Sequence, residues 1–163
     1  MDRDRAAALV AELGTRLGIP GLALDERGSA TLAIDDGAVI VTLGHNPGAG
    51  TIDLMVCLDE VEPSGAQLGR LLAANFGWTA TEGAAFALEP ASGALVLQRR
   101  CSADELGRRG LPNILEGFVA TAEAWAERLA AAPAAGGDDD AADGDGEADA
   151  FDPTQASTMV LRA

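Results

Sequence analysis

The side chains that could do acid–base or metal chemistry are few and lie far apart along the sequence. The only histidine is His45, within the glycine-rich stretch 44–50, and no cysteine or second histidine is near it in sequence. A metal site or a catalytic base normally depends on such a neighbour. We therefore expect His45 to be a solvent-exposed loop residue.

Other catalytic patterns are also missing. Adjacent carboxylates occur at residues 35–36 and 59–60, but neighbouring residues of a strand point to opposite faces, so turn formation is the better interpretation of both pairs. Cys57 and Cys101 are too few for a disulfide scaffold or a zinc cluster. The sequence has no lysine, no phosphate-binding glycine loop and no Gly-x-Ser-x-Gly motif. It predicts a protein that is not an enzyme and uses no metal and no other cofactor.

Charge excludes several classes of partner. The 163 residues include 26 acidic residues against 11 arginines, which gives a net charge of −15 at pH 7. Phosphate backbones and anionic lipid headgroups repel such a chain, so we expect it to bind no nucleic acid and no membrane. No stretch reaches the roughly 18 apolar residues of a membrane span. A cationic or amphipathic protein partner suits this charge.

The composition divides the chain into a domain, residues 1–133, and a tail, residues 134–163. The tail holds eight acidic residues and one arginine, and residues 136–150 are all Gly, Ala, Asp or Glu. Such a segment has too little apolar surface to offset the entropy lost on folding, so we predict that the tail is mostly disordered. Its Asp-x-Asp spacing lacks the glycine and the final glutamate of a calcium-binding loop.

Hydrophobic periodicity predicts the order helix, three strands, helix, two strands, helix in residues 1–133. Leu9, Leu13 and Leu17 recur every four residues, as in an amphipathic helix. Apolar residues then alternate with others in the segments 30–34, 39–43 and 52–58, which is typical of an antiparallel meander. The last helix is expected to begin at about Leu111. Strands and helices grouped in blocks indicate an α+β fold.

The alternation also predicts which strand residues face away from the core. If the apolar residues at 39, 41, 43, 52, 54, 56 and 58 point inward, then Ile40, Met55 and Cys57 point outward. Exposed apolar residues that lie together often mark an interaction surface, and methionine adapts to varied partners. The alternative is that a helix covers this face and makes the three residues part of the core.

The second predicted helix carries small residues beside its leucines. Ala66, Gly69 and Ala73 recur at spacings of three and four, and Gly69 costs about 0.5–1 kcal/mol relative to alanine in a helix interior. Close approach of another backbone would compensate for this cost. That backbone belongs either to the same chain or to a second subunit.

Several local patterns occur together in a fixed order along the chain. They are Leu17-Gly-Ile19, Leu22-x-Leu24-Asp25-Glu26-x-x-Gly28, Leu32-x-Ile34-Asp35, the apolar strand 54–58, Leu71-Leu-Ala-Ala-Asn75, Phe86-x-Leu88, Ser92-Gly93-x-Leu95-x-Leu97 and Leu115-x-x-Phe118 with Trp125 and Leu129. Taken together, the chain resembles one family, the class I (Tir-type) chaperones of bacterial type III secretion. The resemblance spans about residues 9–131 and depends on order, size and charge, since each pattern alone is only a packing signal.

The resemblance implies a homodimer in which three helices pack on a five-stranded antiparallel sheet. It also implies a function in the bacterial cytoplasm: binding the N-terminal segment of a secreted effector and keeping that segment soluble, extended and competent for export. A non-catalytic regulatory module that sequesters a basic protein is the alternative. We expect two sets of contact residues. The effector would contact Ile40, Met55 and Cys57, with Leu9 and Val10 as outer candidates, and the second subunit would contact Leu68, Gly69, Leu72 and Ala73.

Overall fold

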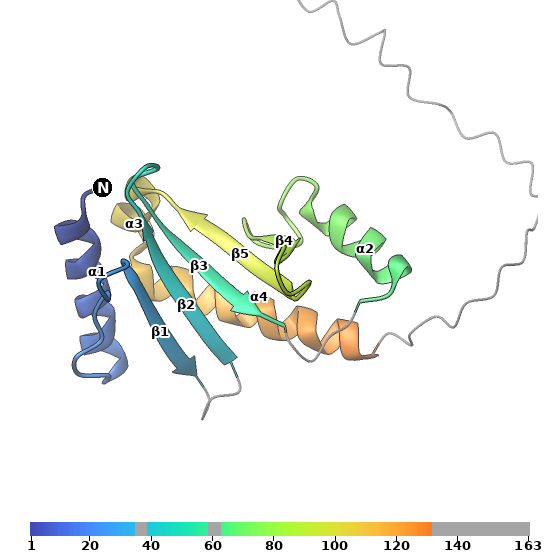
Figure 1. The fold of residues 1–163 in the computed structure, drawn as a ribbon, viewed down its shortest axis with the longest axis horizontal. Coiled ribbons are helices and arrows are strands. Elements are labelled where there is room, and N and C mark those ends of the chain that lie inside the picture. Colours follow the sequence, from blue (N-terminus) through green and yellow to red (C-terminus); the bar gives the residue numbers. More distant parts are fainter. Residues whose placement is uncertain (35–38, 59–62, 132–163) are drawn as a thin grey trace, which may run out of the picture.

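The computed structural model describes residues 1–34, 39–58 and 63–131, which form one antiparallel sheet and four helices (Figure 1). The strand order is β1-β2-β3-β5-β4, so β1 and β4 are the edge strands. The strands are β1 (Ser29–Ile34), β2 (Val39–Asn46), β3 (Thr51–Cys57), β4 (Ala85–Leu88) and β5 (Leu95–Cys101). The predicted five-stranded antiparallel α+β fold is confirmed. The predicted turn at 35–37, the acidic pair at 59–60 and the tail 134–163 lie outside the described residues.

The helices are α1 (Arg3–Leu17), α2 (Gly65–Asn75), α3 (Ala103–Arg109) and α4 (Leu111–Ala131). Three of them match the predicted helices, and α3 is an addition. At seven residues, α3 is too short to show a clear helical period in the sequence. Its ends are nevertheless well marked, because the side chain of Ser102 accepts a hydrogen bond from the Glu105 amide and Gly110 follows with a φ of 75°.

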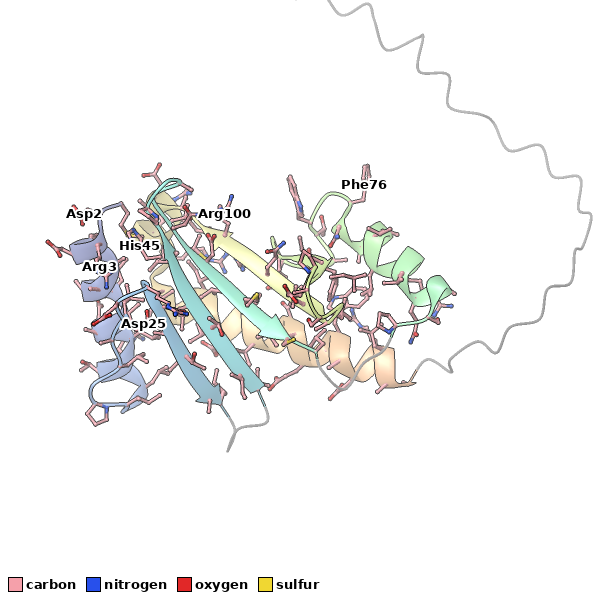
Figure 2. All side chains as sticks on the ribbon, in the orientation of Figure 1. Asp2, Arg3, Asp25, His45, Phe76 and Arg100 are labelled. Carbon is pink, nitrogen blue, oxygen red and sulfur yellow. The ribbon has the colours of Figure 1, made fainter. Side chains whose placement is uncertain are left out.

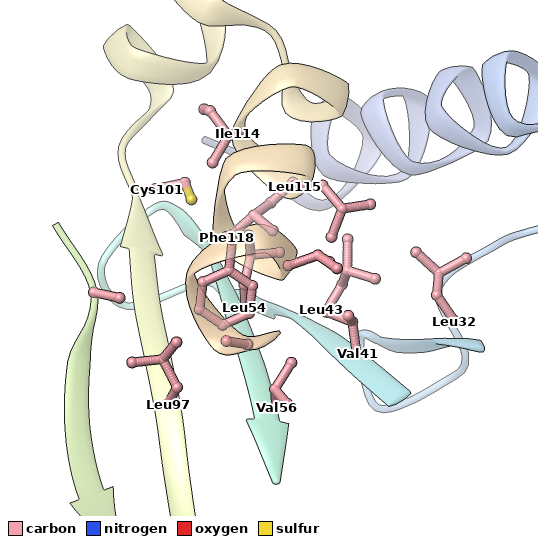
Figure 3. Packing of buried hydrophobic residues seen from close by; sticks show 14 of the residues in the cluster. Leu32, Val41, Leu43, Leu54, Val56, Leu97, Cys101, Ile114, Leu115 and Phe118 are labelled. Carbon is pink, nitrogen blue, oxygen red and sulfur yellow. The ribbon is translucent and has the colours of Figure 1, made fainter. Parts of the chain in front are cut away.

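The core lies between one face of the sheet and the helices α1 and α4, which contact each other (Figure 3). Phe118, Leu115 and Ile114 of α4 lie over the inward-facing residues of the central strands. These strand residues follow the predicted alternation: Val41, Leu43, Leu54, Val56 and Leu97 are each at most 3% exposed. Burial of this apolar set is the main stabilising contribution to the fold.

Two polar side chains attach α2 to the rest of the molecule. Gln67 completes a capping box with Ser64 at the helix start and donates a hydrogen bond to the Leu129 carbonyl of α4 at 3.1 Å. At the other end of α2, the Asn75 side chain forms two hydrogen bonds with the backbone of Phe86 in β4. It donates to the Phe86 carbonyl at 3.1 Å and accepts from the Phe86 N–H at 2.8 Å. Helix α2 is therefore fixed beside the β4 edge, and its remaining surface is turned to solvent.

Candidate partner-binding surface

The sheet face opposite the core carries the residues predicted to point outward. Ile40 is 56% exposed, Met55 is 39% exposed, and Cys57 is also exposed. Helices α1 and α4 contribute to the core cluster on the other face, so no helix of the described chain buries these three side chains. The predicted exposure is confirmed, whereas partner binding by these residues stays a prediction. We call Ile40, Met55 and Cys57 the open sheet face.

The outer candidates on α1 need a correction. Leu9 is 8% exposed and Val10 is fully buried, and both belong to the core cluster. The physical reason is the position of α1, which packs its apolar stripe against α4. Leu9 and Val10 therefore present no surface to a partner, and the α1 residue of the predicted stripe that remains exposed is Leu17, at 46%.

The open sheet face becomes polar toward one end of the strands. There Asp53 of β3 lies opposite Arg100 of β5 and accepts two hydrogen bonds from its guanidinium, at 3.1 and 3.2 Å. Asp53 also accepts a hydrogen bond from the Thr51 hydroxyl at 2.8 Å. Partial burial would raise the pKa of Asp53, but the hydrogen bonds from Arg100 and Thr51 outweigh burial and lower it. This end of the face thus holds an ion pair.

A groove of about 540 Å³ runs over β3 and β5 beside this pair. Its lining includes Met55, Gln98 and Arg100 from the strands, together with Trp78 from the loop that joins α2 to β4. Sequence reasoning missed Trp78, Gln98 and Arg100 as surface residues. The alternation could have identified Gln98 and Arg100 as outward-facing, but no local pattern assigns Trp78 to the same groove as Met55.

Helix α2 presents a second apolar surface. Leu72 is 70% exposed and Phe76, at the end of the helix, is 90% exposed; Figure 2 shows Phe76 pointing away from the rest of the molecule. Gly69 and Ala73 are exposed as well, whereas Leu68 is half-buried and packs against the core. We call Gly69, Leu72, Ala73 and Phe76 the α2 face.

Gly69 has free space around it within the chain. A Cβ atom added at this position would meet no heavy atom within 4 Å, outside its own helix backbone and chain neighbours. The sequence predicted that another backbone, from the same chain or from a second subunit, approaches Gly69. Among the described residues, no backbone of the same chain does so. The absence of a side chain at Gly69 therefore leaves a space that no described residue of this chain fills.

The residues with possible chemistry have structural roles. His45 is half-buried at the end of β2, and its Nε2 lies 3.2 Å from the Met1 carbonyl oxygen, so the prediction of an exposed loop residue is wrong. It was wrong because the strand extends through Asn46 and the N-terminal end of the chain lies against it. Cys101 is buried, and burial, with a contribution from Glu105, raises the pKa of its thiol to about 11. Nowhere in residues 1–34, 39–58 and 63–131 do three or more potential metal ligands cluster.

The chain combines an exposed apolar sheet face with the element order α-βββ-α-ββ-α-α. The sequence matches the profile of the Tir chaperone protein (CesT) family over residues 8–126, and the chain belongs to that family. The family predicted from the sequence is thereby confirmed. Among curated proteins, none matches the sequence.

Several solved structures share this fold. The crystal structure of the ExsC–ExsE complex contains a chain that is 27% identical, with a TM-score of 0.68, over 79% of this chain and 97% of that one. A chain of the HopA1–SchA chaperone–effector complex is 18% identical, with a TM-score of 0.62, over 79% and 97%. A chain of the complex of the Yersinia pestis type III secretion chaperone SycH with a stable fragment of YscM2 is 17% identical, with a TM-score of 0.60, over 76% and 98%.

Proposed function

We propose that this protein is a bacterial cytoplasmic chaperone of type III secretion. It binds the N-terminal segment of a secreted effector and keeps it soluble, extended and competent for export. The observation that carries the proposal is the open sheet face, three exposed side chains that no helix of the described chain covers, in a member of a chaperone family. The chain acts by binding and performs no catalysis.

The physics of binding supports this function. An extended effector segment gains about 25 cal/mol for each Å² of apolar surface that it buries, but it loses the entropy of its unfolded state. A rigid sheet face lowers the second cost, because only one partner has to become ordered. The net charge of −15 attracts basic segments over a distance and speeds their association. Among the residues that the structure describes, no helix is long and apolar enough to cross a membrane.

We further propose that the chain is a homodimer and that the α2 face is the contact between subunits. Leu72 and Phe76 expose most of their surface, and the open space at Gly69 would admit a second backbone. A two-fold contact brings the same patch of both subunits together, so one apolar helix face is sufficient. Leu68 would contribute only its exposed edge, because it already packs on the core.

The test is capture of the partner from the organism that makes the protein. Full-length tagged protein is purified from a lysate, and the bound proteins are identified by mass spectrometry. We expect a secreted protein, and limited proteolysis of the complex should map the protected region to its N-terminal segment. Capture of a basic regulator that is not secreted would replace the proposal by the sequestering module.

A substitution on the open sheet face tests the binding surface itself. M55D places a charge in the middle of this face, where a bound apolar segment would have to desolvate it, so we expect at least a tenfold loss of affinity for the captured protein. The matched control is A130D, which adds the same charge at an exposed position of α4. Circular dichroism should be unchanged for both variants. Equal affinity of M55D and A130D would contradict the assignment of the surface.

A further inference from the structure

In the loop between α2 and β4, the large aromatic side chain of Trp78 is exposed to solvent and its backbone has an unfavourable conformation. Trp78 has a φ of 54° and is 62% exposed. Residues other than glycine seldom adopt this left-handed conformation, and a bulky one does so only where the surrounding structure enforces it. Nothing in the burial of Trp78 repays this cost, since most of its surface faces solvent.

The loop is held in place by a dense set of hydrogen bonds. The Trp78 carbonyl accepts from the Gly83 amide at 3.0 Å and from the Thr81 hydroxyl at 3.4 Å, and that hydroxyl also lies 2.6 Å from the Ala84 carbonyl. From α4, the Trp125 indole donates to the Ala80 carbonyl at 3.1 Å. The indole of Trp78 is therefore displayed by a rigid loop rather than by a mobile one.

Trp78 lies where its exposed side chain could contact a bound partner. Its side chain lines the groove over β3 and β5, with Met55 and Gln98 among the other lining residues. Met55 is 39% exposed, and the Asp53–Arg100 ion pair also lines the groove. Because that pair carries no net charge, the groove favours an uncharged side chain beside it.

We propose that Trp78 and Met55 form a side-chain pocket of the partner-binding surface. Its occupant is an aliphatic side chain of a basic, extended effector segment in which apolar residues occur at every second position. The alternation follows from the sheet, because outward residues such as Met55 and Cys57 are two apart on β3 and repeat every 6.6 Å or so, the same spacing as in an extended peptide. The basic residues in between follow from the net charge of −15. This inference rests on the proposed function and adds a specificity residue to it.

Because the backbone of Trp78 is strained, this residue can be replaced by glycine without loss of stability. W78G removes the indole and also relieves the left-handed backbone, so the variant should unfold at the same temperature as the wild type or higher. The matched control is E82G, in the same loop, where Glu82 has a φ of 51°. E82G relieves the same kind of strain but leaves the pocket intact.

The probes are two fluorescently labelled peptides of identical composition, GRVRLRVG, which alternates, and GRRRVLVG, which does not. Fluorescence anisotropy with the full-length chain should give an affinity for the alternating peptide at least about tenfold higher, as expected for a pocket centred on tryptophan. W78G should lose this preference, and E82G should keep it.

Two results would overturn the pocket: a wild-type protein that binds both peptides equally, or a W78G variant that still discriminates between them. A W78G variant whose mass in light scattering falls to half that of the wild type would assign the indole to the subunit contact instead. The proposed function is tested separately by the capture experiment. If no secreted protein is captured, the proposed function fails, whatever the result of the peptide experiment.

Discussion

Removal of the Phe76 ring is the most direct test of the proposed subunit contact. This side chain is 90% exposed in the protomer, and its loss should leave the fold of the protomer intact. Full burial of a phenylalanine is worth about 1.5–3 kcal/mol, and a two-fold contact buries the ring twice. F76S is therefore expected to weaken the dimer by about 3–6 kcal/mol, which is an increase of roughly two to four powers of ten in its dissociation constant.

Sedimentation equilibrium over several decades of protein concentration measures this constant. The wild type should sediment at twice the mass of the 16.5 kDa chain, and F76S at the mass of one chain over most of the range. I40S is the matched control, because Ile40 is also an exposed apolar residue but lies on the open sheet face. Equal dissociation constants for F76S and I40S would refute the assignment of the α2 face, and a wild type that stays monomeric would refute the dimer.

Two further predictions use the same protein preparations. G69A should raise the unfolding midpoint of the monomeric F76S variant, since alanine favours a helix by about 1 kcal/mol over glycine, while in the wild-type background it should weaken the dimer by filling the space at Gly69. Between pH 9 and about 11, the urea midpoint of the wild type should fall more than that of C101A. The unfolded thiol of Cys101 ionises from its ordinary pKa of 9.0, whereas the folded thiol stays protonated until about 11, so rising pH favours unfolding. The chain has no lysine or tyrosine to obscure this effect, and identical pH profiles for wild type and C101A would contradict it.

Local sequence patterns were sufficient where one face of an element is buried and the other is not. The period of two in the strands correctly separated the inward residues, such as Val41 and Leu54, from the outward ones, such as Ile40 and Met55. The seam of α4 was equally clear, and α4 begins at the predicted Leu111. These features are readable because a shift by one residue would exchange the core and solvent faces of a whole strand.

Patterns failed where exposure depends on a neighbour distant in the chain. The stripe of α1 indicated a buried face, but not that the core would bury Leu9 and Val10 almost fully while Leu17 stays 46% exposed. His45 was misjudged because the residues that enclose it come from the N-terminal end of the chain. The short helix α3 offers too few residues for a period, although its capping residues Ser102 and Gly110 are visible in the sequence.

The amino-acid sequence by itself determined the family, the order of the strands and of the three longer helices, the acidic charge and the outward apolar residues of the strands. All of these depend on residue type and on spacing along one element. Only the tertiary structure decided which apolar surfaces remain uncovered and which side chains share them. Trp78, in the loop after α2, lines the same groove as Met55 of β3. Such proximity depends on how elements pack in three dimensions, and spacing along the chain does not encode it.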